Sequence, residues 1–234
     1  MKTHFLTELF DLIAPRECAI CCQRLTATES VICGECHLGL PLTGFSQKPY
    51  DNPMARLFWG LLPVEKAAAY FYYIPHAQSS QMIYRLKYHH QPEVGESLGQ
   101  ILAKELKRSD FFSDIDAIVP IPVTAQRARE RGYNQSMEIA RGIRDVTQLP
   151  ILSKVVKRIK FDESQTQKKG WERQENVEGA FQLLNPDAVR GKHLLVVDDI
   201  VTTGSTVKAC AQELCKAGDV RISIVALGFT KGES

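Results

Sequence analysis

The stretch that decides the fold is residues 194–206, which read Leu-Leu-Val-Val-Asp-Asp-Ile-Val-Thr-Thr-Gly-Ser-Thr. Its four apolar residues predict a buried strand that carries Asp198 and Asp199 to its carboxyl end. A turn of small hydroxylated residues follows, and an amphipathic pattern then predicts a helix over 205–217. Because the amino terminus of a helix presents unpaired N–H groups and a positive dipole, this turn predicts a site for an anion.

Two adjacent carboxylates beside a phosphate need neutral hydroxyls or a cation as partners. A ribose diol together with Mg²⁺ would satisfy Asp198 and Asp199, and the turn would then hold the phosphate of the same sugar. An acidic turn capped by Ser and Thr would explain the start of the helix, but not the paired acids. The stretch lacks the Gly-Lys-Ser/Thr of a Walker loop. The residues that would surround the phosphate are Thr202, Thr203, Gly204, Ser205 and Thr206.

Short apolar runs alternate with helical patterns along the rest of the chain. The expected strands are 67–74, 117–119, 194–197 and 222–227, and the expected helices are 98–106, 139–146 and 205–217. This order predicts an α/β fold, a mostly parallel sheet flanked by helices, with ligands beyond the carboxyl ends of the strands. In the last helix Cys210 and Cys215 fall on the apolar stripe, so we expect them in the core.

Cysteine pairs mark the first part of the chain. Cys18 and Cys21 form one C-x2-C pair, Cys33 and Cys36 form a second, and residues 22–32 separate them. This spacing predicts a structural zinc ribbon in which four thiolates close a tetrahedral Zn²⁺ site. Three alternatives stay open: Cys22 in place of Cys21, a role for the neighbouring His37, and a loose group of free thiols. We expect a ribbon region over residues 1–50 and a main domain over 60–234.

Composition places the chain among globular proteins. Of 234 residues, 44% are hydrophobic and 24% charged, which excludes a disordered or collagen-like chain. No uncharged apolar run approaches the ~18 residues needed to cross a bilayer, so we expect no membrane span. The first residues carry charges and lack a cleavage site, which predicts a cytoplasmic protein without a secretory signal. The oligomeric state is not indicated.

Two basic runs, 127–144 and 154–173, fit phosphate contacts or solvated helix faces and loops about equally well. Residues 158–176 are polar without an apolar period, and we interpret them as a lid. Arg85 and Lys87 alternate with Leu86, which predicts that both lie on one side of a strand or turn.

Together these motifs resemble the phosphoribosyl pyrophosphate (PRPP) binding site of the type I phosphoribosyltransferases, and more narrowly the competence protein F (ComF) family, also called GntX-like. The resemblance covers nearly the whole chain. It rests on the cysteine ribbon, the acidic turn at 194–206, and the stretches at 84–88, 119–122, 131–136, 164–166 and 175–181.

The resemblance implies roles for individual residues. Asp198 and Asp199 would hold the ribose hydroxyls and hydrated Mg²⁺, and the turn 202–206 would bind the 5′-phosphate. Arg131, the third residue expected in catalysis, and Arg127 would meet the pyrophosphate, although Arg127 fits a solvated helix equally well. Lys168, in the lid, would meet the pyrophosphate when the lid closes.

Two functions follow from the resemblance. The first is transfer of a phosphoribosyl group from PRPP to an unidentified nucleobase or amine, with release of pyrophosphate. The second is a non-catalytic competence factor that binds single-stranded DNA or a DNA-processing partner and uses the PRPP pocket to sense a nucleotide. A net charge of +2 and an aromatic content of 8%, without a clear stacking platform, argue against nucleic-acid binding alone.

Overall fold

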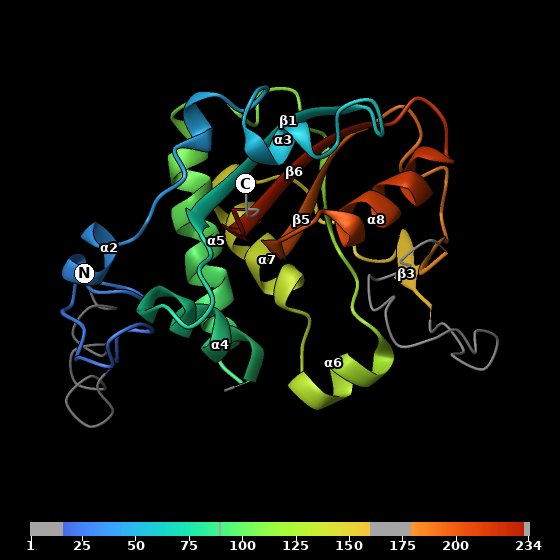
Figure 1. The fold of residues 1–234 in the computed structure, drawn as a ribbon. Helices are drawn as coiled ribbons and strands as arrows, with labels where there is room; N and C mark the ends of the chain where they lie inside the picture. The colour runs from blue at the N-terminus through green and yellow to red at the C-terminus, as the bar shows by residue number, and fades with distance from the viewer. Residues whose placement is uncertain (1–15, 89, 160–178, 232–234) are drawn as a thin grey trace, which may run out of the picture.

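A four-stranded parallel sheet forms the centre of the molecule (Figure 1). The computed structural model describes residues 16–88, 90–159 and 179–231. The strands lie in the order β1 (Val64–Tyr72), β6 (Arg221–Phe229), β5 (His193–Val201) and β2 (Ala117–Pro120). Their inner residues are buried on both faces, as the continuous apolar runs in the sequence indicate. The expected α/β fold is confirmed.

Helices cover both faces of this sheet. Helices α5 and α7 pack against each other, and α7 contacts β2 and β5, whereas α8 contacts β5 together with a two-stranded antiparallel sheet of β3 and β4 (Figure 1). Right-handed crossovers account for this arrangement, because the chain moves from β1 to β2 in one direction and from β5 to β6 in the other. The bounds are α2 Gly34–Leu38, α3 Pro53–Arg56, α4 Gln81–Tyr88, α5 Pro92–Lys107, α6 Ala125–Arg131, α7 Gln135–Thr147, α8 Ser205–Cys215, β3 Val156–Arg158 and β4 Phe181–Leu183.

Glycines allow α5 and α7 to approach closely. A Cβ atom at Gly142 of α7 would clash with the backbone of Glu96 in α5, and one at Gly99 of α5 would clash with the backbone of Ile139 in α7. The side chain of Asn134 caps α7 by accepting a hydrogen bond from the N–H of Ser136. These contacts fix the loop after β2 relative to the carboxyl ends of the strands.

The cysteine-rich region packs against the first strand. The N–H of Tyr72 donates to the carbonyl of Pro41, and the hydroxyl of Thr43 donates to the carbonyl of Ala69. The Oη atom of Tyr70 lies 2.9 Å from Nε2 of His37. The buried side chains of the cysteine region and the sheet belong to one hydrophobic cluster. The expected division between residues 1–50 and 60–234 stays a prediction.

Residues 84–88 do not form the strand or turn that we expected. They lie in helix α4, whose buried side chains Met82, Ile83 and Leu86 follow a helical spacing. The alternation of Arg85, Leu86 and Lys87 was therefore misleading, because residues i and i+2 of a helix do not share a face. The hairpin of β3 and β4 was also not expected from the sequence.

Within the described residues, no helix is both long enough and apolar enough to cross a bilayer. The side chain of Cys210 is fully buried in α8 and that of Cys215 is half-buried.

Candidate functional site

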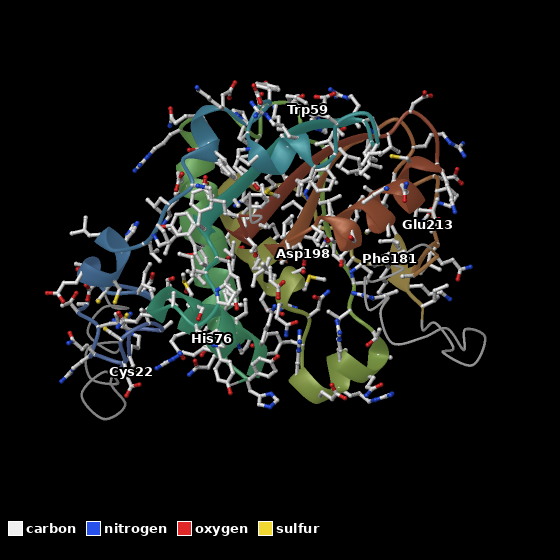
Figure 2. All side chains as sticks on the ribbon, viewed as in Figure 1. Cys22, Trp59, His76, Phe181, Asp198 and Glu213 are labelled. Carbon is white, nitrogen blue, oxygen red and sulfur yellow. The ribbon has the colours of Figure 1, made fainter. Side chains whose placement is uncertain are left out.

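The carboxyl end of β5 holds the two acids that the sequence singles out. Figure 2 labels Asp198 at this position. Its Oδ1 atom accepts hydrogen bonds from the N–H of Asp199, at 2.8 Å, and from the hydroxyl of Ser136 in α7, at 3.3 Å. Oδ1 of Asp199 accepts from the N–H of Ile200, at 2.7 Å. The backbone thus orients both carboxylates without neutralising either.

Electrostatics make this acid pair unusual. Burial, and then the charge of the neighbouring Asp199, raise the pKa of Asp198 to about 7. The hydrogen bond from the N–H of Asp199 and the charge of Lys87 act in the opposite direction. Near neutral pH the Asp198 carboxyl is therefore partly protonated, and a bound cation would favour its ionised form.

Lys87 is a residue of this site that the sequence reasoning missed. Its Nζ atom lies 3.0 Å from Oδ2 of Asp199, and both side chains are partly buried. On the same helix, a guanidinium nitrogen of Arg85 lies 2.9 Å from Sγ of Cys22 and 3.7 Å from a carboxylate oxygen of Glu17. Helix α4 thus contacts the cysteine region with one side chain and the acid pair with another. The helical spacing of Met82, Ile83 and Leu86 was the signal that could have revealed it.

The hydroxyl-rich turn between β5 and α8 is open to solvent. Thr202 and Thr203 are exposed, and the Oγ atoms of Thr203 and Ser205 lie 2.8 Å apart. Gly204 stands at the N-cap of α8 with a φ of +77°, a conformation that favours glycine, and a Cβ there would meet the ring of Phe58. A small cavity is lined by Asp198, Ile200, Val201, Thr202, Thr203, Gly204, Ser205, Thr206 and Val207. Asp198 and the hydroxyls of the turn thus share one hollow at the start of a helix.

The structure describes two of the three basic residues that we expected to contact a pyrophosphate. Arg131, at the end of α6, donates to Oε1 of Gln135 at 2.8 Å. Its guanidinium lies 5.7 Å from the ring centroid of Tyr88 in α4, the helix that carries Lys87. Arg127 is exposed on α6, and its N–H donates to the hydroxyl of Thr124. Lys168 and most of the expected lid lie outside the described residues.

The four cysteines of the two C-x2-C pairs come together in space. Their sulfur atoms all lie within 4.8 Å of one another, and the residues are Cys18, Cys21, Cys33 and Cys36. Cys22 is exposed beside Arg85, and the ring of His37 contacts Tyr70. Of the two candidates left open by the sequence, Cys21 lies in the cluster and Cys22 lies outside it.

The chemistry of this cluster fits a thiophilic metal ion such as zinc. Burial alone would raise the pKa of Cys18, but hydrogen bonds from backbone N–H groups, including that of Cys33 at 3.4 Å, lower it to about 7. Burial and the other thiols raise the pKa of Cys36. Thiols this close together would share protons among themselves, whereas a divalent cation would balance several thiolates at once.

Comparison with known families identifies the family of this chain. The family model described as the phosphoribosyl transferase domain matches residues 87–233. The chain belongs to this family. Its match begins at Lys87 and includes the acid pair, the hydroxyl-rich turn and α8.

Relatives of this phosphoribosyltransferase-domain chain carry names that refer to DNA utilization or to competence. The DNA utilization protein YhgH of Escherichia coli strain K12 is 30% identical over 213 residues, covering 90% of this chain and 88% of its own. Competence protein F of Haemophilus influenzae is 29% identical over 152 residues, covering 63% of this chain and 66% of its own. The chain is thus a member of the ComF family, as its motifs indicated.

Among solved structures, a glutamine PRPP amidotransferase from B. subtilis in complex with ADP and GMP is similar over 58% of this chain and 26% of that chain. Its sequence identity is 21% and its TM-score is 0.37.

A second group of acids lies at the opposite edge of this domain, where the strands begin. Carboxylate oxygens of Glu65 and Asp114 and a ring nitrogen of His193 lie within 4.8 Å of one another. Lys66 donates to Asp114, and Arg221 donates to Glu65 at 3.1 Å and to Asp114 at 3.4 Å. Two cations thus match two carboxylates, and the group is an ion-pair network that joins β1, β5 and β6.

Proposed function

We propose that this protein binds PRPP together with Mg²⁺ at the end of β5 and transfers the phosphoribosyl group to an acceptor, a nucleobase or an amine. The observation that carries the proposal is the meeting of an acid pair, whose ion-pair partner among the described residues is Lys87, with a hydroxyl-rich turn at the start of α8. Asp198 and Asp199 would accept hydrogen bonds from the ribose hydroxyls. The N–H groups and hydroxyls of residues 202–206 would hold the 5′-phosphate.

In this reaction the bond between C1′ and the pyrophosphate oxygen breaks, and its electron pair leaves with the pyrophosphate. The acceptor nitrogen forms the new bond to C1′ and loses a proton. Arg131 and Arg127 would stabilise the charge on the leaving group, as would Lys168 in the segment outside the described residues. Bound Mg²⁺ would supply further positive charge to the pyrophosphate.

Calorimetry with PRPP and Mg²⁺ tests the binding step. Asp199→Asn and Thr203→Ala should each weaken binding about 10-fold or more, because each removes a polar contact to a charged or hydroxylated ligand. Asp187→Asn, which changes an exposed acid in an ion pair with Arg190, is the matched control and should bind like the unmodified protein. No binding heat for the unmodified protein would refute the proposal.

The acceptor requires a second measurement. Release of pyrophosphate from PRPP should appear with one class in a panel of nucleobases and amines and should be lost in Asp199→Asn. If the protein binds PRPP but releases no pyrophosphate with any acceptor, it is a PRPP-binding protein and the transferase assignment is refuted.

We also propose that Cys18, Cys21, Cys33 and Cys36 hold a structural zinc ion. Native mass spectrometry should find one zinc per chain. The double change Cys18→Ser and Cys33→Ser should remove it and lower the thermal midpoint by about 10 °C, as expected for a loss of about 3–4 kcal/mol. Cys22→Ser, outside the cluster, is the control and should keep both the metal and the midpoint. A metal-free unmodified protein would contradict the proposal.

The names of the relatives support a second candidate, a non-catalytic competence factor. Such a protein would bind single-stranded DNA or a DNA-processing partner and use the PRPP pocket as a nucleotide sensor. Its affinity for single strands should fall steeply with added salt, because lysine and arginine contacts to phosphates release counterions. A flat salt response would argue against phosphate contacts.

A further inference from the structure

Helix α4 carries a pair of exposed tyrosines that no contact of the proposed PRPP site uses. The side chains of Tyr84 and Tyr88 are 52% and 59% exposed, although their rings lie against each other with centroids 4.9 Å apart. The guanidinium of Arg131, from α6, lies 5.7 Å from the centroid of the Tyr88 ring. A single exposed aromatic residue needs no explanation, but two rings in contact, tilted by 43° with an arginine over one of them, form an ordered surface.

The position of this tyrosine pair follows from the geometry of the helix. Tyr84, Lys87 and Tyr88 are related as i, i+3 and i+4, so they share one face of α4. Lys87 on this face contacts Asp199 at 3.0 Å. The tyrosine pair therefore lies on the face of α4 from which Lys87 reaches the acid pair, and Tyr88 also contacts Arg131 of α6.

We propose that Tyr84 and Tyr88 form a stacking surface for the ring of a nucleobase, next to the site proposed for PRPP. Aromatic side chains bind bases of any sequence, because every base has a π-face. Arg131 adds a cation beside the stack that can contact a phosphate attached to the base. This inference rests on the proposed function for its neighbouring site, and it favours a planar acceptor over a small amine.

The nucleobase that stacks on the tyrosines could belong to a single-stranded nucleic acid or could be a free base. The exposed rings suit a base carried on a strand that crosses the surface, since an enclosed pocket would bury them further. The two sources differ in charge: a strand brings phosphates to Arg131, whereas a free base does not. Binding of a strand should therefore depend on salt, and binding of a free base should not.

Two titrations measure the sources separately. The first follows the fluorescence anisotropy of a labelled single-stranded oligothymidylate of about 16 nucleotides. The second is calorimetry with free adenine and free uracil in the presence of PRPP and Mg²⁺. For whichever compound binds, the double variant Tyr84→Ala and Tyr88→Ala should weaken binding by about 5-fold to 100-fold, the range expected for the loss of base stacking.

Matched variants separate stacking from other effects. Tyr84→Phe together with Tyr88→Phe keeps the rings and should keep the affinity. Tyr50→Ala removes a tyrosine that is 62% exposed elsewhere and should have no effect. If the strand binds, Arg131→Gln should reduce the salt dependence by about one phosphate contact, which the tyrosine variants should leave unchanged. If the double alanine variant fails to fold, the two single variants carry the test.

The inference would be overturned if the double alanine variant bound with the same affinity as the unmodified protein. It would also be overturned if the unmodified protein bound neither the oligothymidylate nor a free base. PRPP binding is measured on the same samples. Tyrosine-dependent binding without PRPP binding counts against the proposed function alone. PRPP binding without tyrosine-dependent binding counts against this inference alone.

Discussion

Both edges of the sheet carry a pair of acids, but within the described residues only the pair at the amino edge has one cation for each carboxylate. At the amino edge, Glu65 and Asp114 meet Lys66 and Arg221, and the pKa of Asp114 is lowered by Lys66 and His193 despite its burial. At the carboxyl edge, Asp198 and Asp199 share Lys87, and the pKa of Asp198 is raised. The comparison indicates that charge balance separates a stabilising network from a site that is ready for a ligand.

Of the two edges of the sheet, the amino edge is expected to show the larger effect on stability. Asp114→Ala should lower the free energy of unfolding by about 2–3 kcal/mol, because the variant leaves the buried Lys66 without its carboxylate partner. This value is smaller than that for a fully buried ion pair because the side chain of Asp114 is 37% exposed. Urea denaturation measures this loss. Because the folded pKa of Asp114 is lowered, the loss should be complete above pH ~4 and should shrink as the pH falls through the folded pKa.

PRPP binding by Asp114→Ala should equal that of the unmodified protein. Asp187→Ala, in an exposed ion pair with Arg190, is the control for the loss of an ordinary surface acid and should change stability by less than about 0.5 kcal/mol. Weakened PRPP binding by Asp114→Ala would show that the two edges are not independent.

A smaller effect of opposite sign is expected at the carboxyl edge. The folded pKa of Asp198, about 7, is above the usual value of ~3.9, so its contribution to stability is complete below pH ~4 and is lost as the pH rises through 7. Asp198→Asn cannot ionise. The pKa difference of about three units corresponds to at most about 4 kcal/mol. Because the side chain of Asp198 is partly exposed, we expect the variant to gain about half of this, about 2 kcal/mol, relative to the unmodified protein as the pH rises from 4 to 8.

Urea denaturation over this pH range checks the expectation for Asp198→Asn. The same variant should bind PRPP more weakly, so stability and binding would change in opposite directions. A difference in stability that does not vary with pH would show that Asp198 is as well compensated as Asp114.

The smallest change is expected for Lys87→Met. Loss of this partly exposed ion pair should alter stability by about 1 kcal/mol or less. Because Lys87 lowers the pKa of Asp198, its removal should raise that pKa above 7, which NMR titration of the aspartate carboxyl carbons would detect. Lys216→Met, at an exposed ion pair with Glu213, is the control. An unchanged titration of Asp198 would remove Lys87 from the site.

The sequence could predict a site where its residues are contiguous. The acid pair and the turn 202–206 lie in one strand–turn–helix unit, so local chemistry was enough to find them. The two C-x2-C pairs likewise have a spacing that allows them to converge on one point. Lys87 was missed because it lies more than one hundred residues from Asp199 and reaches it only through the packing of α4.

The sequence predicted less about residues whose roles depend on contacts with distant parts of the chain. Gln135 has no sequence pattern of its own, yet it is buried and holds Arg131. Likewise, Tyr84 and Tyr88 gave no sign of a stacking surface while α4 was read as a strand or turn, because that surface requires the i, i+4 spacing of a helix. The roles of Arg127, Arg131 and Lys168 stay predictions.

By itself, the sequence determined the class of the fold, the strand that delivers two acids, and the cysteines that converge, because each of these depends on residues near one another along the chain. Tertiary structure decided how many cations meet each acid pair, since charge balance depends on side chains from other elements. Among the described residues these are Lys66 and Arg221 at one edge and Lys87 at the other. Local pattern specifies the groups, and only packing specifies their electrostatic partners.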